Sequence, residues 1–184
     1  MKKFLLTLAS LVAFSSQAAV ISVDLADSEI AVGDTTTVNI TGEFDSQTEA
    51  FDVALLRVFF DTSALLVNSL TVASDLPSDD VFFDPFVIIE ELPGEVSMSW
   101  FSSFAGTYTN PAPFSLFSFE VTATTVGVFD FTFDSTNLDN LDFYNSELQE
   151  SIATELNAAS LTVTDGVAAD VAAPQTALLL ALAL

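Results

Sequence analysis

The stretch "FSLFSFEVTATTVGVFDFTFD", Phe114 to Asp134, decides the fold class of this chain. Its second half alternates phenylalanine with polar residues: Phe129, Phe131 and Phe133 against Asp130, Thr132 and Asp134. Its first half alternates in the same way: Phe117, Phe119 and Val121 against Ser118 and Glu120. Side chains two positions apart lie on the same face of a strand. Each half therefore predicts a β-strand with one buried face and one wet face.

Similar segments recur from residue 20 to residue 165. They are rich in β-branched and aromatic residues, and turn-forming pairs such as Gly33-Asp34 and Pro93-Gly94 separate them. The predicted strands are 20–25, 35–41, 50–61, 65–74, 86–90, 95–104, 114–123, 127–134 and 159–165. About nine strands at intervals of roughly ten residues predict an all-β fold, an antiparallel two-sheet sandwich or jelly roll. One segment, 144–157, favours a helical turn or two instead.

The N-terminus has the features of a secretory signal peptide. Lys2 and Lys3 precede an apolar run at 4–14, and the small residues Ser16-Gln17-Ala18 follow it. The run is too short to span a bilayer, which needs about 20 apolar residues. We therefore predict that residues 1–18 are a signal peptide and that the protein is exported.

The mature chain is strongly acidic. It keeps Arg57 as its only basic residue against 26 carboxylates, a net charge of −25. Such a charge repels nucleic acid and anionic lipid headgroups, so we predict no nucleic-acid partner. The chain also lacks cysteine, so the fold must rest on its hydrophobic core. Divalent cations are plausible companions because they relieve charge repulsion.

Residue types exclude most catalytic chemistry. Without His or Cys, the chain cannot build Ser-His-Asp or Cys-His nucleophiles, or His-ligated zinc, haem or iron–sulfur centres. No lysine remains after the signal peptide, which excludes Schiff bases and phosphate-binding P-loops. Carboxylate-pair chemistry of the glycosidase kind remains open. We predict no catalytic residues and a non-enzymatic protein.

One acidic loop is a candidate calcium site. The stretch "DSTNLDNLDFYN", residues 134–145, gathers carboxylate and amide oxygens within a few positions. A hard cation such as Ca²⁺ takes six to eight oxygen ligands. The candidate ligands are Asp134, Asn137, Asp139 and Asp142. Calcium is the one cofactor that the sequence suggests, and a solvated acidic loop is the alternative.

Aromatic side chains beside loops are candidates for ligand binding. Most of the 18 phenylalanines must fill the core. Trp100 shares the register of Met98, which predicts that Trp100 is buried. Phe101 and Tyr108 flank one loop and are the candidate ligand-binding residues. Core packing is the alternative for both.

Three segments together resemble a known family. They are "VGDTTTVNI" (32–40), "AFDVALLRVFFDTSAL" (50–65) and "FSLFSFEVTATTVGVFDFTF" (114–133). Their order and apolar spacing resemble the cohesin-like domain, a jelly-roll sandwich related to carbohydrate-binding modules. The resemblance implies one cohesin-like β-sandwich over residues 20–165. Cohesins of cellulosomes bind dockerin modules, which makes a protein partner an expectation.

The C-terminal stretch "VAAPQTALLLALAL" resembles the start of a PEP-CTERM-type sorting signal. Ala172-Ala173-Pro174 stands where the family has Pro-Glu-Pro, and Thr176 precedes an apolar run. That run has only eight residues, far short of a membrane span. We therefore expect a linker at 166–172 and a truncated sorting segment at 173–184. A complete segment of this kind implies transient membrane association and export in a Gram-negative bacterium that makes exopolysaccharide.

These observations predict a non-enzymatic protein of the cell surface or extracellular matrix. It would act in adhesion, binding extracellular polysaccharide or a surface protein through its cohesin-like sandwich. Two alternatives remain open. One is a purely structural, calcium-stabilised matrix component, and the other is a carboxylate-based glycan-cleaving enzyme.

Overall fold

The computed structural model describes residues 18–44, 49–73, 76, 86–102, 107–109, 112–137 and 139–166, of which 69–73 and 86–87 are described by their backbone alone. The predicted sorting segment, nearly all of the predicted linker, and all of the predicted signal peptide except its last residue lie outside these ranges. They stay predictions. Within the described ranges, no helix is long and apolar enough to cross a membrane.

Thirteen strands are found in the described part of the chain. They are β1 (Ala19–Leu25), β2 (Glu29–Ala31), β3 (Thr35–Glu43), β4 (Val53–Phe59), β5 (Leu65–Ala73), β6 (Phe86–Leu92), β7 (Glu95–Phe101), β8 (Phe114–Ala123), β9 (Gly127–Phe131), β10 (Leu141–Asn145), β11 (Glu150–Ser151), β12 (Thr154–Asn157) and β13 (Ala159–Thr164). Each of the nine segments expected to be strands overlaps one of them, and the bounds differ by a few residues at most ends.

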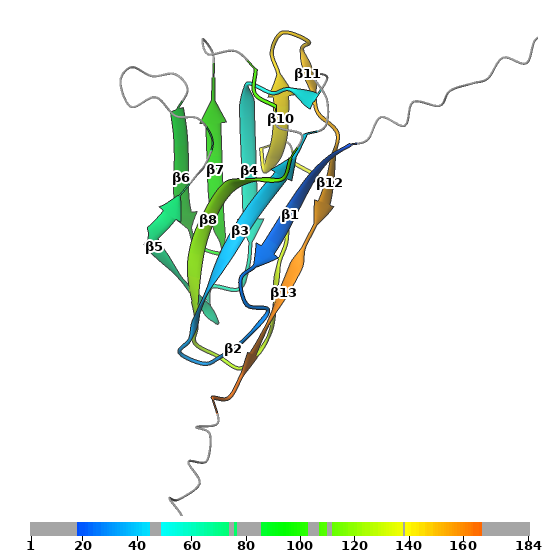
Figure 1. Ribbon diagram of the computed structural model, residues 1–184. Helices are drawn as coiled ribbons and strands as arrows, with labels where there is room; N and C mark the ends of the chain where they lie inside the picture. Colours follow the sequence, from blue (N-terminus) through cyan, green and yellow to red (C-terminus); the bar gives the residue numbers. More distant parts are fainter. Residues whose placement is uncertain are drawn as a thin grey trace, which may run out of the picture.

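The strands form two stacked layers (Figure 1). One layer, the β3 sheet, has the order β12-β1-β3-β8-β5. The other, the β4 sheet, has the order β11-β10-β4-β7-β6. A third sheet, β2-β13-β9, continues the β4 sheet at one end, because an isolated bridge joins Phe59 of β4 to Thr132 just beyond β9. The predicted all-β sandwich is therefore confirmed.

The alternation that predicts the fold class places side chains as expected. On β8 the inward residues Phe117, Phe119 and Val121 are buried, and the residues between them are only half-buried. On β9 Phe131 is fully buried, whereas Asp130 is exposed. The inward residues of the two sheets thus meet in one apolar core, as a sandwich requires.

Aromatic rings fill one end of this core. Phe51 lies 4.6 Å from Phe44 and 5.1 Å from Phe143 between ring centroids. Trp100 meets Phe51 edge-on at 5.4 Å and is 1% exposed, which confirms its predicted burial. Tilted and edge-on pairs at these distances are favourable beyond the area that they bury. Phe51 therefore lies at the centre of this aromatic cluster, in contact with rings from several segments of the chain.

A second aromatic group lies near the opposite end of β4. The ring of Phe60 lies 5.9 Å from that of Phe119 and 5.6 Å from that of Phe131. Phe60 directly follows β4, and the other two residues come from β8 and β9. They therefore tie the β3 sheet to the β4 sheet and to its β9 extension.

The prediction of a helical turn within 144–157 is wrong. The segment forms the end of β10, a tight turn, β11 and β12. Buried Asn145 holds the turn: Nδ2 donates to the carbonyl of Ala50 at 2.6 Å, and Oδ1 accepts two turn amides at 3.0 Å each. The carboxylate of buried Asp52 accepts the amide of Ser146 at 3.0 Å and also its hydroxyl. Tertiary hydrogen bonds thus replace the bonds that a local helix would make.

Strand number and direction also differ from the expectation of about nine antiparallel strands. Four strands lie outside the nine expected segments: β2, β10, β11 and β12. The first strand is interrupted between β1 and β2, and the last between β12 and β13, while β10 and β11 form a separate antiparallel pair. The two interrupted strands pair in parallel, β1 with β12 and β2 with β13. The remaining pairings between described strands are antiparallel, as expected.

We predict that Phe51→Ala lowers the free energy of unfolding by about 3–5 kcal/mol, because it leaves a cavity among four aromatic neighbours. Urea denaturation of the two proteins measures the difference. Val128→Ala is the control, since Val128 is 66% exposed and its loss should change stability by less than about 0.5 kcal/mol. Equal effects of the two changes would contradict this account of the core.

Candidate functional site

The outer face of the β4 sheet carries a trough along β7, the strand between β4 and the edge strand β6. The sequence "VSMSW" alternates serine with large apolar residues. Met98 and Trp100 therefore point into the core, where each is 1% exposed, and Ser97 and Ser99 point outward. Because both outward side chains are small, the surface along β7 is recessed relative to the strands on either side.

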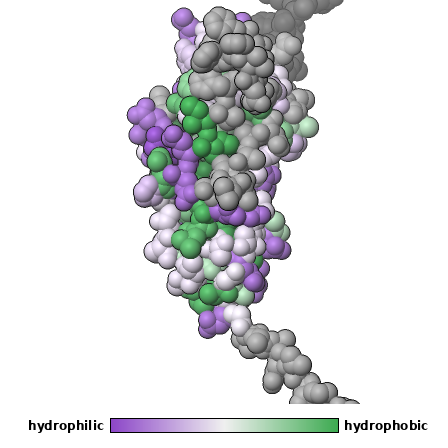
Figure 2. Space-filling view, turned by 90° about the vertical axis from the view of Figure 1, so that its left-hand side faces the viewer, coloured by the Kyte–Doolittle hydropathy of each residue, from purple (hydrophilic) through white to green (hydrophobic). Residues whose placement is uncertain are grey.

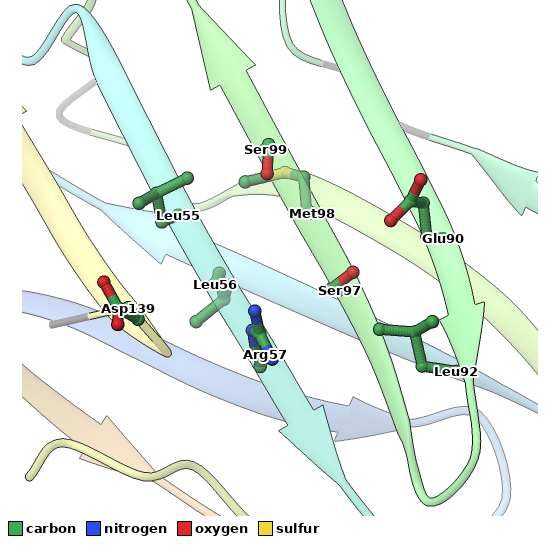
Figure 3. A pocket seen from close by; sticks show the side chains of 9 residues that line it. All are labelled: Leu55, Leu56, Arg57, Glu90, Leu92, Ser97, Met98, Ser99 and Asp139. Atoms are coloured by element: carbon green, nitrogen blue, oxygen red, sulfur yellow. The ribbon is translucent and has the colours of Figure 1, made fainter. Parts of the chain in front are cut away.

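Taller side chains from the neighbouring strands form the walls of the trough (Figure 3). Leu55 and Arg57 of β4 lie opposite the two serines on one side. Glu90 and Leu92 of β6 stand on the other side. The hollow between them has a volume of about 340 Å³. Asp139, from the loop before β10, also lines it, on the far side of β4.

The β6 wall is unusually apolar for an exposed edge strand. Ile88 is 46% exposed and Leu92 is 38% exposed, and both point outward in register with β7. Glu90 lies between them and is also exposed. On the side of the molecule where β5 and β6 lie, hydrophobic and strongly hydrophilic surface adjoin (Figure 2). The trough thus combines exposed aliphatic surface with carboxylates at its rim.

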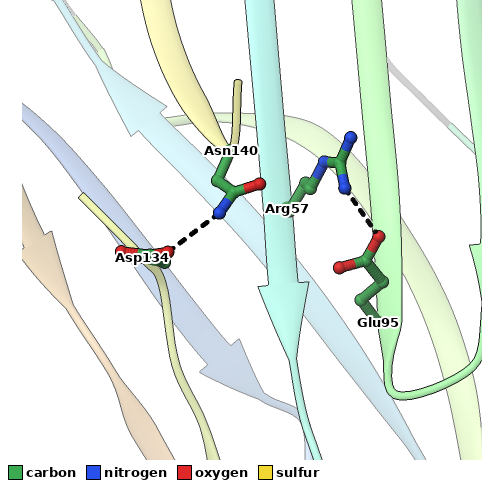
Figure 4. Close-up of polar contacts among 4 residues, drawn as sticks. All are labelled: Arg57, Glu95, Asp134 and Asn140. Atoms are coloured by element: carbon green, nitrogen blue, oxygen red, sulfur yellow. Dashed lines mark hydrogen bonds and ion pairs between the residues drawn. The ribbon is translucent and has the colours of Figure 1, made fainter. Parts of the chain in front are cut away.

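Arg57, the only basic residue of positions 19–184, is held within this face (Figure 4). Its Nη1 lies 3.0 Å from Oε1 of Glu95, and the side chains are 37% and 11% exposed. Its amide donates to the carbonyl of Asn140 at 2.9 Å. A poorly hydrated carboxylate needs a charged or hydrogen-bonding partner. Arg57 is therefore engaged in supporting Glu95 and adds little free positive charge to the trough.

The loop at 134–140 is braced by its own side chains (Figure 4). Oδ1 of Asp134 accepts the amide of Thr136 at 2.9 Å and its hydroxyl at 2.5 Å, and Oδ2 accepts Nδ2 of Asn140 at 2.8 Å. Oδ1 of Asn137 accepts the amide of Asp139 at 3.0 Å. The bonds from Thr136, followed by the bond from Asn140, hold the pKa of Asp134 below its ordinary value. The loop thereby presents Asp139 at the trough.

The structure places the candidate calcium ligands in two different settings. Asp134, Asn137 and Asp139 belong to the braced loop, whereas Asp142 lies on β10 opposite Leu55. Oδ1 of Asp142 is buried without a hydrogen-bond partner. No group of three Asp or Glu residues suited to a metal ion is found within the described ranges. Calcium binding here stays a prediction.

The two candidate aromatic residues lie on opposite sides of the β4 sheet. Phe101 ends β7 in the outward register of the serines and is half-buried. Tyr108 forms an isolated bridge with Phe51, and its ring lies 5.3 Å from that of Phe114 and 6.2 Å from that of Trp100. Tyr108 thus packs against the core and Phe101 faces the trough side. The structure does not bring them into one platform, and their binding role stays a prediction.

Sequence reasoning missed the trough itself. Two features of the sequence pointed to the trough. Ser97 and Ser99 alternate with large apolar residues in β7, and exposed aliphatic residues occur in β6, the strand that precedes β7 in the hairpin. Recognising the trough also requires knowing that β7 lies between β4 and β6, and the pairing of β7 with β4 is long-range. The alternation of a strand shows which face of the sheet a residue lies on. It does not show which strands pair with it.

The outer face of the β3 sheet is different in character. Its outward side chains are mostly hydroxyls, amides and carboxylates that bond one another in pairs: Thr35 with Thr122 at 2.9 Å, Ser115 with Asn39 at 2.5 Å, Thr41 with Asp24 at 2.8 Å and Asn157 with Ser22 at 3.2 Å. A second hollow of about 230 Å³ lies there, beside Ser22, Asp24, Thr41 and Pro113. The outer face of the β3 sheet is thus mainly polar and self-bonded, with Leu66 as an exposed aliphatic residue, and the outer face of the β4 sheet sets serines beside the exposed aliphatic residues of β6.

Comparison with known proteins gives structural relatives only. No family model and no curated protein sequence matches the chain. A cohesin of Acetivibrio cellulolyticus, solved in complex with a dockerin, superposes with a TM-score of 0.63 at 15% identity over 79% of this chain and 98% of that one. A cohesin of Clostridium acetobutylicum, solved in solution, gives 0.58 at 17% identity over 80% and 93%.

A non-cellulosomal cohesin from the hyperthermophilic archaeon Archaeoglobus fulgidus is also similar, with a TM-score of 0.57 at 12% identity over 81% of this chain and 93% of that one. Identities this low establish shared architecture. The chain therefore has a cohesin-like fold, a β-sandwich of the jelly-roll kind, as its sequence predicts.

We predict that Asp134→Asn lowers the melting temperature at neutral pH, because an amide cannot accept all three hydrogen bonds that the carboxylate accepts. The folded-state pKa of Asp134 is lowered, so its contribution is present above its ordinary pKa and is lost as the pH falls through the folded value. The difference from the wild type should therefore shrink as the pH falls below 3.8, the ordinary value for this carboxyl group. Asp165→Asn, at an exposed position, is the control; a constant difference would argue against this role.

The calcium prediction is tested by thermal melting with added Ca²⁺ or with EDTA. A bound cation that recognises only the folded state raises the melting temperature as its concentration rises. If the loop is the site, Asp139→Asn should abolish the rise and Asp24→Asn, on the β3 sheet, should leave it intact. A melting temperature that does not depend on calcium rejects the prediction.

Proposed function

We propose that this protein is an exported, non-enzymatic binding protein of the bacterial cell surface or extracellular matrix. Its β-sandwich docks a partner protein on the outer face of the β4 sheet. The observation that carries this proposal is the trough, with its serine floor and Leu92 in its wall, together with exposed Ile88 next to it on the same edge strand.

The apolar wall supports docking on energetic grounds. Ile88 and Leu92 belong to a seven-residue strand, β6, at the edge of its sheet. Exposed aliphatic side chains in one row, rimmed by polar groups, are typical of interaction surfaces. Covering them stabilises a complex by roughly 25 cal/mol for each Å² of apolar surface removed from water, before the costs of association.

The charge of this face selects the kind of partner. Glu90 and Asp139 are exposed beside the trough, and the nearby cation Arg57 is paired with Glu95. The mature chain as a whole carries a net charge of −25. A partner that presents Lys or Arg around an apolar centre complements this face and is drawn to it electrostatically.

The structural relatives support a protein as the partner. The similar cohesin of Acetivibrio cellulolyticus is solved with a dockerin bound, and other cohesins of this fold are also solved as complexes with dockerins. The predicted signal peptide supports export. The lack of His and Cys supports a function without catalysis, because it excludes most catalytic chemistries. Only carboxylate-pair chemistry of the glycosidase kind remains open.

The polar face of the β3 sheet favours a second candidate, polysaccharide binding. Its hydroxyls, amides and carboxylates are groups that hydrogen-bond sugars, and Pro113 adds an apolar side to the hollow there. A glycan array probed with the protein, with and without calcium, tests this candidate. Retention that Asp24→Ala reduces supports it, and no retention under either condition rejects it.

We predict that partner binding is lost when the trough is filled. A phage-displayed library of gene fragments from the source genome is selected on the wild-type protein, and the enriched fragments are measured individually. Ser99→Trp should weaken binding at least about tenfold, because the indole occupies the hollow. Ser118→Trp, an outward serine on the central strand β8 of the other sheet, is the matched control and should bind normally.

Fragments that bind both variants equally well would place the docking surface elsewhere. Fragments that lose binding to Ser118→Trp alone would move it to the β3 sheet. Circular dichroism of both variants checks that each remains folded.

A further inference from the structure

The β4 sheet ends on an edge strand, β6, whose outer edge pairs with no strand in the described part of the chain (Figure 1). β6 is seven residues long, and all seven pair with β7 in one unbroken register. The other outer strands of the two main sheets offer less. β11 has two paired residues, β12 has four, and the register of β5 shifts between Asn68 and Ala73. β6 therefore offers the longest regular edge at which another strand can add.

The register of the β6–β7 hairpin shows which main-chain groups face the free edge. The hairpin closes through the two-residue turn Pro93-Gly94, so Leu92 and Glu95 form its last hydrogen-bonded pair. Hydrogen-bonded and non-hydrogen-bonded pairs then alternate along the two strands. The residues whose amides and carbonyls point away from β7 are therefore Val87, Ile89 and Glu91. No hydrogen bond is found from this edge to any residue that the structure describes.

Both faces of β6 combine aliphatic and acidic side chains. On the outer face, Ile88 is 46% exposed and Leu92 is 38% exposed, with exposed Glu90 between them. On the inner face, Ile89 packs against the core, whereas Glu91 has the inward register and yet stays exposed. A strand added at this edge thus covers aliphatic surface and meets two adjacent carboxylates.

The two carboxylates decide which kind of strand can add. Neither Glu90 nor Glu91 forms an ion pair with a residue that the structure describes. A charge in the inward register of an edge strand opposes pairing with a second copy of the same strand. A second copy also brings 26 acidic residues against 3 basic ones next to an equal charge. A strand with Lys or Arg opposite both glutamates removes these penalties, because opposite charges on facing residues stabilise a strand pair.

We propose that the free edge of β6 accepts an extended segment of a partner protein as an additional strand, antiparallel because that pairing is slightly more stable. The segment carries Lys or Arg opposite Glu90 and Glu91, and aliphatic residues opposite Ile88 and Leu92. Strand addition takes its affinity from main-chain hydrogen bonds and its specificity from alternate side chains. The proposal rests on the proposed function, because it describes how the docked partner extends from the trough onto β6, the strand that forms one wall.

A synthetic β-hairpin peptide, closed by a disulfide, serves as the probe. Its outer strand reads Leu-Lys-Lys-Val-Val, which places the leucine opposite Leu92 and the two lysines opposite Glu91 and Glu90. A preformed strand is used because it loses less conformational entropy on binding. Fluorescence anisotropy of the labelled hairpin measures its affinity for the full chain. N-methylation of the two outer-strand amides that face β6 should weaken binding at least about tenfold, because it removes hydrogen bonds and keeps the charges.

Charge reversal on the protein tests the choice of partner. Glu90→Lys combined with Glu91→Lys should weaken binding of the hairpin at least about tenfold, because its lysines then face like charges. Glu150→Lys combined with Glu155→Lys is the matched control. It makes the same change of charge at exposed positions of β11 and β12, at the opposite edge of the sandwich, and should change the affinity by less than about twofold.

Two results would overturn the proposal. One is equal binding of the hairpin to the wild type and to the reversed β6 variant. The other is a hairpin that does not bind the wild type at about 1 mM, or whose N-methylated form binds as well as the unmethylated one.

A proline variant tests the main-chain contact from the side of the protein. Ile89→Pro removes an amide that faces the free edge, a position where an edge strand tolerates proline. Ile89→Ala loses the same side chain and keeps the amide. The gene fragments enriched on the wild type should bind Ile89→Pro at least about tenfold more weakly than Ile89→Ala. Circular dichroism of both variants checks that each remains folded.

The same fragments separate this proposal from the proposed function. Fragments weakened by both Ser99→Trp and Ile89→Pro support the docking face and the added strand. Weakening by Ser99→Trp alone leaves the docking face in place and rejects the added strand. Weakening by Ile89→Pro alone supports the added strand and rejects the trough as the docking surface. Fragments that bind both variants as they bind the wild type reject both proposals.

Discussion

The packing of aromatic rings between the two sheets is the constraint on which the rest of this structure depends. The chain has no cysteine to cross-link it, and it carries three basic residues against 26 carboxylates, so charge opposes the compact state. The core must supply the opposing free energy. It does so with rings from both sheets, of which Phe51 and Phe119 are completely buried. Each ring removes a large apolar area from water and contacts its neighbours at tilted or edge-on angles.

A core of this kind leaves the outer faces free to differ. The β3 sheet covers its outer face with hydroxyls and amides that bond one another, and this face needs no partner to satisfy them. The β4 sheet instead sets two serines between taller walls and exposes Ile88 on its edge strand. The same stretch, β7, serves both purposes. Its inward residues Met98 and Trp100 fill the core, and its outward serines form the trough floor.

The sequence was sufficient for the fold class and insufficient for the site, and particular residues show why. Period-two alternation placed Phe131 and Trp100 correctly, because alternation is a local property of a strand. The segment 144–157 was misjudged because Asn145 and Asp52 hold its turn through bonds to residues far away in sequence. The sequence pattern did not predict the trough or the parallel pairing of the terminal strands, because both depend on which strands become neighbours. The sequence indicates a candidate calcium site in the loop at 134–140. Composition does not show that Asp134 accepts hydrogen bonds that brace this loop.

We expect the aromatic core to hold the sandwich together by itself, and any bound cation to act only on the loop at 134–140. Amide hydrogen exchange of the protein in EDTA, repeated with calcium, measures this most directly. We expect the amides of β3, β4, β7 and β8 to exchange slowly and at the same rate in both conditions, because these strands surround the core. Calcium should change exchange only in the loop, if it changes any. Rapid exchange of the central strands in EDTA that calcium slows would contradict the account, because the fold would then depend on the metal.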